Sequence, residues 1–68
     1  MKILEWRKKE NKTQTQVAAD LGVDQSTVQK WEVGIKIPTF ENMQKITAYT
    51  CGEVTANDFY EVTNENNS

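Results

Sequence analysis

The segment Thr13–Gly34, TQTQVAADLGVDQSTVQKWEVG, constrains the fold of this chain more than any other feature. Thr13 and Gln16 have the spacing of a capping box, in which each side chain satisfies the backbone N–H of the other residue at the start of a helix. Gly22 follows Leu21 at the position where helices commonly end in a left-handed residue, which glycine adopts without strain. The pattern therefore predicts a helix over residues 14–21 that ends abruptly.

A second helix is predicted over residues 25–33. Asp24 is expected to cap its start, Val28 and Trp31 are three residues apart and face inward, and Gly34 ends it. The two helices are joined by a turn of three to four residues that contains a glycine, which is the helix-turn-helix pattern. The outward positions at the start of the second helix are all polar. They are Gln25, Ser26, Gln29 and Lys30.

Two further amphipathic helices are predicted around this pair. Ile3 and Trp6 share one side of a helix over residues 2–9. A loop that contains the only proline of the chain precedes another helix, in which Phe40, Met43 and Ile46 are expected to face inward. The core is therefore expected to be compact and built mostly from neighbouring helices.

The last part of the chain is predicted to be a turn, a short helix and a tail. Thr55 and Asp58 form a second candidate capping box ahead of a helix that ends near Tyr60. Residues 63–68 are polar, lack periodicity and are expected to be disordered. The predicted fold is an all-α, compact bundle of four to five short helices, with one helix-turn-helix domain over residues 1–62.

Composition excludes several classes of protein. A chain of 68 residues forms at most one domain and buries only about 60% of its unfolded surface. The absence of histidine removes the commonest general base at neutral pH and the commonest metal ligand, so we expect no enzymatic activity, metal or cofactor. Cys51 is the only cysteine, so no intrachain disulfide can form, which favours the cytoplasm. We expect its side chain to be partly buried and unreactive.

No apolar run approaches the ~20 residues that a membrane-spanning helix needs, and the N-terminus lacks the apolar stretch of a signal peptide. A membrane is therefore not an expected partner. No small-molecule ligand is expected either, because the chain has no room for a ligand-sensing domain.

Charge is unevenly distributed along the chain. The formal net charge is −2, but residues 1–45 carry +2 and residues 46–68 carry −4. Phosphate binding needs lysine and arginine, so the overall acidity argues against a nucleic-acid partner, whereas the basic first part of the chain is compatible with one. Charge alone does not choose between these two interpretations.

The chain resembles the phage repressor and Cro family of bacterial DNA-binding proteins over almost its whole length. The features that carry the resemblance are Arg7 after an inward aromatic residue, Thr13-Gln14, Ala18, Gly22, Gln25-Ser26-Thr27-Val28, Trp31-Glu32, Gly34 and Pro38. The closing GEVTANDF is similar to the ends of short Cro-like proteins. The resemblance implies a lambda-repressor-like domain that binds double-stranded DNA sequence-specifically. It further implies that the protein is a Cro-like phage or prophage repressor, which blocks a promoter by occupying it. Such a protein is expected in the bacterial cytoplasm, at the nucleoid.

Three departures from the family pattern stand out. Lys12 occupies a position that is usually apolar, so the entry to the helix over residues 14–21 is expected to be looser than usual. Asp24 brings a negative charge close to an expected phosphate. The loop sequence Ile35-Lys36-Ile37 offers one base where many relatives place two or three.

The resemblance also assigns roles to individual residues. In helix-turn-helix proteins the start of the second helix reads base edges in the major groove, and the first helix lies across the phosphate backbone. The expected base-reading residues are Gln25, Ser26, Gln29 and Lys30. The expected phosphate-binding residues are Gln14, Thr15, Thr27 and Lys36. Gln14 is further expected to brace Gln25, and Trp31 is expected in the core rather than on a stacking surface.

A structural ion pair and a dimer are expected as well. The resemblance implies a largely buried pair between Arg7 and Glu32. Reading domains of this size usually combine two half-sites, so we expect a homodimer on a pseudo-palindromic operator. The apolar residues left over after the predicted core is filled suggest the interface. They are Tyr49, Val54, Phe59, Tyr60 and Val62.

Two other functions remain open from the sequence. An antitoxin would bind both an operator and a toxin. A protein-interaction module would keep the fold without binding DNA, and the low pI of about 5.0 is the observation that favours it.

Overall fold

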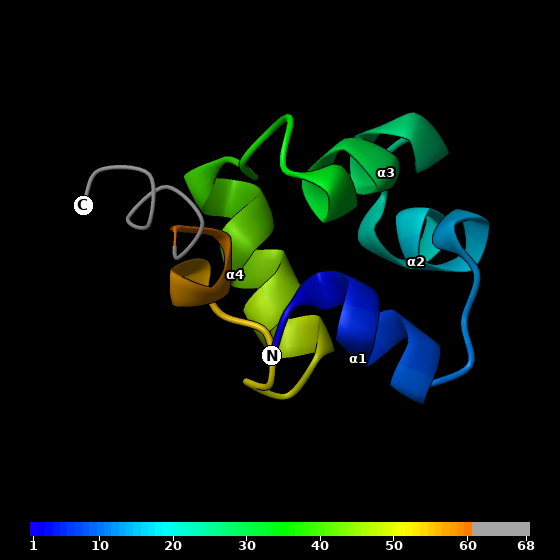
Figure 1. The fold of residues 1–68 in the computed structure, drawn as a ribbon, viewed down its shortest axis with the longest axis horizontal. Helices are drawn as coiled ribbons and strands as arrows, with labels where there is room; N and C mark the ends of the chain where they lie inside the picture. Colours follow the sequence, from blue (N-terminus) through cyan, green and yellow to red (C-terminus); the bar gives the residue numbers. More distant parts are fainter. Residues whose placement is uncertain (61–68) are drawn as a thin grey trace.

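The computed structural model describes residues 1–60, and all of their regular secondary structure is helical (Figure 1). The helices are α1 (Ile3–Lys9), α2 (Gln14–Leu21), α3 (Gln25–Val33) and α4 (Phe40–Tyr49), followed by a helical stretch over residues 56–60. The predicted all-α bundle with a helix-turn-helix is confirmed. The predicted boundaries of the first three helices agree with the structure to within one residue. The predicted tail over residues 63–68, the domain boundary at 62 and Val62 lie outside the described residues.

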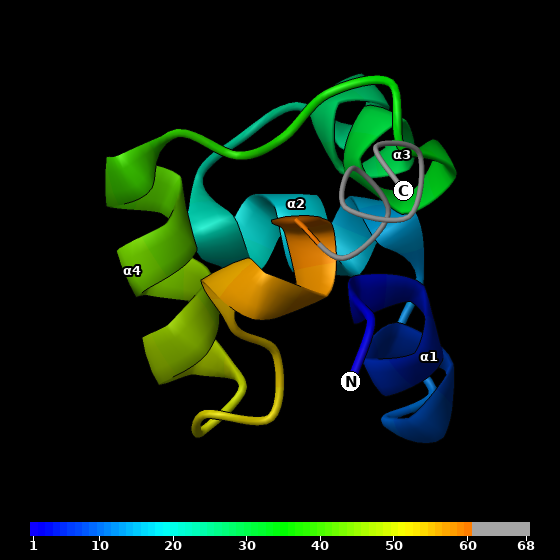
Figure 2. The same ribbon diagram turned by 60° about the vertical axis from the view of Figure 1, so that its left-hand side comes forward.

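The core lies where all the helices meet. Val17 of α2, Val28 of α3, Ile46 of α4 and Val54 are almost completely buried, and both tryptophans are 5% exposed. Trp31 is therefore a core residue, as predicted. Figures 1 and 2 show α2 and α3 packed together, and in Figure 1 α4 lies on the side of the molecule away from the N-terminal end of α3. This arrangement leaves the starts of α2 and α3 at one surface.

The ends of α2 follow the predicted chemistry. The backbone N–H of Thr13 donates to Gln16 Oε1 at 2.8 Å, and the backbone N–H of Gln16 donates to Thr13 Oγ1 at 3.1 Å. Gly22 has φ +76°, so the helix ends in the left-handed residue that the sequence indicated. The predicted cap of α3 is wrong in one respect. Asp24 occupies the N-cap position, but its exposed carboxylate accepts no capping hydrogen bond.

Two predicted side-chain orientations are wrong. Phe40 is 78% exposed. The buried residues of α4 and of its C-cap span an arc of about 60° around the helix axis, and they are Met43, Ile46 and Thr50. Phe40 points about 90° away from the centre of this arc. Cys51 is exposed rather than partly buried. The buried place next to it belongs to Thr50, whose hydroxyl donates to the Ile46 carbonyl at 2.9 Å, and the chain then turns outward at Cys51 with φ +55°.

Lys12 makes several contacts at the entry to α2, where the sequence led us to expect a looser start. Its backbone N–H donates to the Arg7 carbonyl at 3.0 Å, and its ammonium lies 3.7 Å from Asp20 Oδ2 and 5.9 Å from the centre of the Tyr49 ring. The Tyr49 hydroxyl donates to the same Asp20 oxygen, and its ring contacts Trp6 with centroids 5.1 Å apart. The alkyl stem of the lysine can cover apolar surface while its charge reaches Asp20.

The second capping box forms only in part. The backbone N–H of Thr55 donates to Asp58 Oδ2 at 2.9 Å, whereas the backbone N–H of Asp58 donates to the Thr55 carbonyl rather than to its hydroxyl. Burial tends to raise the pKa of Asp58, but hydrogen bonds from Thr55 and from the N-terminal ammonium outweigh burial and lower that pKa. No helix among residues 1–60 is long and apolar enough to cross a membrane.

Candidate nucleic-acid interface

The outward side of α3 is polar and exposed. Val28 and Trp31 are buried on its inner side. Its four expected base-reading residues lie within an arc of about 140° on the other side. All four are exposed, namely Gln25, Ser26, Gln29 and Lys30. A helix with this shape and chemistry can enter the major groove of DNA with its polar side chains against the base edges.

The expected phosphate-binding residues lie at the start of α2, in the first turn of α3 and in the loop after α3. Thr15 is exposed and Gln14 half-buried at the start of α2, Thr27 is half-buried in the first turn of α3, and Lys36 is exposed in the loop after α3. The structure also joins the end of α1 to this region. A shallow hollow is lined by Lys8, Lys12, Gln14, Thr15 and Gln25, among others. The sequence did not indicate that Lys8 reaches this surface, because its helical spacing only predicts exposure to solvent.

Glu32, near the end of α3, is the centre of a hydrogen-bond network. Its Oε2 accepts from Arg7 Nε at 2.6 Å, and its Oε1 accepts from Arg7 Nη2 at 3.1 Å and from Gln14 Nε2 at 2.8 Å. The third guanidinium nitrogen, Arg7 Nη1, donates to the Lys12 carbonyl at 3.0 Å. The structure thus brings together the predicted pair, with side chains 14% exposed for Arg7 and 4% for Glu32.

The ion pair has a clear electrostatic signature. The hydrogen bond to Glu32 raises the pKa of the Arg7 guanidinium; burial opposes this rise and the charge of Glu32 adds to it. Arg7 is therefore held firmly in its charged form. A bidentate pair of this kind fixes both side chains in orientation as well as in charge.

The network continues from Glu32 to the expected reading surface. Gln14 Oε1 accepts a hydrogen bond from Gln25 Nε2, so the bracing that the resemblance implies is present in the structure. A carboxylate only accepts hydrogen bonds, so Gln14 must present its NH₂ group to Glu32 and its oxygen to Gln25. Gln25 then keeps its own oxygen and its second N–H for another partner. This pair of groups is the complement of the major-groove edge of adenine.

The residues expected at a dimer interface have very different exposures. Val54 cannot contribute to a surface, because its side chain is 0% exposed in the core. Tyr49 and Phe59 are half-buried and pack against that core, and Tyr60 is 47% exposed. The expectation about Val54 is wrong, because the turn after α4 directs this residue inward above Thr50, whose hydroxyl accepts from its backbone N–H at 3.1 Å.

Comparison with known proteins agrees with this geometry. No curated protein and no solved structure matches the chain. A family model described as helix-turn-helix matches residues 3–50, which include α1 to α4 entirely. This is a family of DNA-binding regulators rather than of enzymes. The chain therefore belongs to the helix-turn-helix family of DNA-binding transcription regulators.

Proposed function

We propose that the protein binds a specific double-stranded DNA operator and acts as a Cro-like phage or prophage repressor that blocks a promoter by occupying it. The observation that carries the proposal is the network from Glu32 through Gln14 to Gln25, which holds a base-reading amide in one orientation at the start of α3. Repression by occupancy needs no activity other than binding, and a fixed reading surface supplies it.

Two groups of residues divide the work of recognition. Gln25, Ser26, Gln29 and Lys30 read base edges from the exposed side of α3. Gln14, Thr15, Thr27 and Lys36 bind phosphates on either side of it. The start of α2 supports the second role, because free backbone N–H groups and the positive end of the helix dipole favour an anion there.

The experiment that tests this division compares Gln25→Ala with Lys36→Ala on an operator selected from a random DNA pool. Gln25→Ala should weaken operator binding by ~1–3 kcal/mol and relax the preference at one position of each half-site, with little change in affinity for random DNA. Lys36→Ala should weaken binding to all sequences alike and reduce the salt slope by about 1 for each phosphate that the lysine neutralises. Circular dichroism must first show that both variants are folded. Identical effects of the two substitutions on operator and random DNA would contradict the division.

A second function is favoured by the net charge of −2 and by apolar residues exposed after α3. These features suit a module that binds protein, or an antitoxin that binds both protein and DNA. An electrophoretic shift with random DNA at low and moderate salt separates a DNA-binding protein from a module that binds protein alone. Binding at low salt that weakens as salt rises supports a DNA-binding protein, and no binding at either salt concentration supports a module that binds protein alone.

A further inference from the structure

Val33, in the last turn of α3, is an apolar residue that the core does not use. Val28 and Trp31, the other apolar residues of this helix, are buried, whereas Val33 is 58% exposed. A β-branched residue also has a lower helix propensity than most polar residues with long side chains. Neither packing nor propensity therefore accounts for a valine at this position. A single exposed apolar residue needs no special explanation, but the direction of this one is informative.

Val33 belongs to the same side of α3 as the expected base-reading residues. Gln25, Gln29 and Val33 are four positions apart, and each step of four residues turns by about 40°, so the three form one stripe along the helix. Val33 falls near the middle of the arc that the four expected base-reading residues span. It lies about 170° around the helix axis from the midpoint of Val28 and Trp31. Its side chain therefore points away from the core and along the proposed reading surface.

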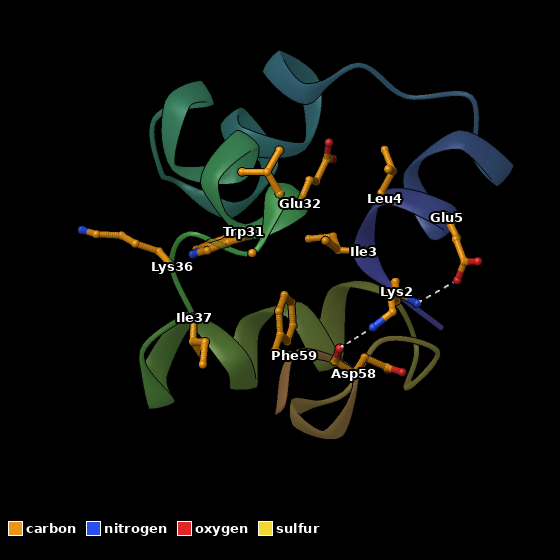
Figure 3. A pocket seen from close by; sticks show the side chains of 12 residues that line it. Lys2, Ile3, Leu4, Glu5, Trp31, Glu32, Lys36, Ile37, Asp58 and Phe59 are labelled. Atoms are coloured by element: carbon orange, nitrogen blue, oxygen red, sulfur yellow. Dashed lines mark hydrogen bonds between the residues drawn. The ribbon is translucent and has the colours of Figure 1, made fainter. Parts of the chain in front are cut away.

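The residues around the end of α3 leave Val33 accessible. Val33, Trp31 and Lys36 are among the residues that line a hollow of about 350 Å³ at the C-terminal end of the helix. In Figure 3 the Lys36 side chain extends away from this hollow. The backbone N–H of Lys36 donates to the Lys30 carbonyl at 3.3 Å, which holds the start of the loop against α3. Lys36 can therefore bind a phosphate beside the end of α3 while Val33 stays exposed.

We propose that Val33 contacts the 5-methyl group of a thymine, and that it determines specificity at a base pair that the polar residues of α3 do not read. This step rests on the proposed function. Among the four bases only thymine presents an apolar group in the major groove, and apolar side chains are suitable partners for it. A valine side chain neither donates nor accepts hydrogen bonds, so it leaves the polar edge of any other base without a partner. Val33 therefore both favours thymine and disfavours the alternatives.

The length of α3 limits where this thymine lies in the operator. Gln25 is the first residue of α3 and Val33 the last, and their separation corresponds to about 12 Å along the helix axis. Successive bases of one strand are about 3.4 Å apart along the DNA axis. A helix parallel to the groove would place the thymine about three to four base pairs from the base that Gln25 reads, and any tilt brings the two closer. We therefore expect it within about four base pairs of that base.

Replacement of thymine by deoxyuridine, which lacks only the methyl group, tests the contact. An operator is first selected from a random DNA pool with the native protein, and each thymine near the Gln25 position is then replaced in turn, equivalently in every half-site. At one of these positions the native protein should lose affinity by about fourfold for each half-site, which is the value of one buried methyl group. Val33→Ala should bind the thymine operator as weakly as the native protein binds the deoxyuridine operator, and should lose nothing further with deoxyuridine. Alanine favours a helix and Val33 is exposed, so circular dichroism should show an unchanged fold.

Phe40→Ala is the matched control, because Phe40 is also an exposed apolar residue but lies at the start of α4. This variant should lose affinity with deoxyuridine as the native protein does. Two results would overturn the proposal: a native protein that binds all the deoxyuridine operators as well as the thymine operator, or a Val33→Ala variant that loses as much affinity with deoxyuridine as the native protein. Either result leaves the proposed function intact when the native protein binds its operator and Gln25→Ala relaxes the preference. A native protein that selects no operator would instead contradict the proposed function itself, and the role of Val33 with it.

Discussion

Glu32 links the stability of the fold to the surface that we propose to read DNA. Its carboxylate accepts three hydrogen bonds and is 4% exposed, so almost nothing of it is left for water. Glu32→Ala leaves the Arg7 charge largely buried without its partner. Breaking a buried pair from one side costs roughly 3–5 kcal/mol, which is a large part of the stability of so small a domain. Urea unfolding followed by tryptophan fluorescence measures this loss.

The size of the loss distinguishes two kinds of ion pair. A decrease in the free energy of unfolding below about 1 kcal/mol is typical of solvent-exposed pairs and would contradict burial. Lys9 and Glu53 provide the matched control, because they also form an ion pair but their side chains are 43% and 40% exposed. Lys9→Ala, which removes the exposed base of this pair, should therefore have only a small effect on stability.

Glu32→Gln tests the orientation of the reading amide. A glutamine at position 32 can donate as well as accept, so Gln14 is no longer compelled to direct its oxygen at Gln25. When the Gln14 amide turns over, its NH₂ group faces Gln25, so Gln25 must accept with its own oxygen. Both N–H groups of Gln25 then point outward, which suits the two acceptors of guanine. We expect the discrimination of adenine from guanine at one position of each half-site to fall, with affinity for random DNA unchanged.

This effect is measured by competition between operators that differ only at that base pair, at a temperature where the variant is folded. Gln25→Ala identifies the position, because it should abolish the preference there. A variant with Glu32→Gln that keeps the full preference for adenine, or loses affinity for every sequence equally, would show that Glu32 stabilises the fold without orienting Gln25.

At the level of helices, local chemistry accounts for what the sequence predicted correctly. The capping box of α2 and the glycine after it involve residues at most a few positions apart, so their meaning does not depend on the rest of the fold. The errors arose where orientation depends on packing. Phe40, Met43 and Ile46 are three residues apart, but three residues make less than one full turn, so each step moves the side chain around the helix. Only contact with other elements decides which residues of α4 are buried.

The exposure of the proposed reading surface was predictable for the same reason, and the network behind it was only partly so. Periodicity along α3 is enough to place Gln25 and Gln29 outward once Val28 and Trp31 are placed inward. The contact between Glu32 and Gln14 depends on how α3 crosses α2, and nothing in the spacing of the two residues indicates it. The pair of Arg7 and Glu32 was expected only because the chain resembles a known family.

Tyr49 joins three helices and makes stability depend on pH at the alkaline end. Burial, and then its hydrogen bond to Asp20, raise the pKa of Tyr49 far above its usual value near 10. The folded protein therefore keeps a proton that the unfolded chain releases above about pH 10, so this contribution to stability is complete below that pH and is lost as the pH rises further.

Tyr49→Phe tests this dependence, since phenylalanine cannot ionise in either state. The free energy of unfolding is measured by urea for both proteins between pH 8 and pH 11, a range chosen to bracket the usual tyrosine pKa of about 10. The variant should be less stable than the native protein at the lower pH, where the hydrogen bond to Asp20 counts, and the difference should shrink as the pH rises. Curves that stay parallel would show that the tyrosine ionises alike in both states.

The molecule as a whole combines an acidic composition with a surface that we propose to bind phosphates. Its net charge of −2 offers little long-range attraction to DNA, and Asp24 places a negative charge beside the reading surface. Three of the four residues to which we assign phosphate contacts, Gln14, Thr15 and Thr27, are uncharged. Neutral donors position a protein on the backbone but add no positive charge to replace the counterions of DNA. Affinity must then depend on hydrogen bonds more than on charge.

A weak dependence of binding on salt follows from this balance. Each phosphate that a base neutralises contributes about −0.9 to the slope of log affinity against log salt concentration. In each copy these charges come from Lys36 alone, or at most from Lys36 together with Lys8 and Lys30. A dimer should therefore show a slope between about −2, for one lysine in each copy, and about −5, for three. Operator affinities over a range of salt concentrations give this slope, and Lys36→Ala should reduce its magnitude by about 2 in the dimer. A slope steeper than about −8 would mean that many more bases contact the backbone, and that the acidic composition conceals a basic surface larger than the one around α3.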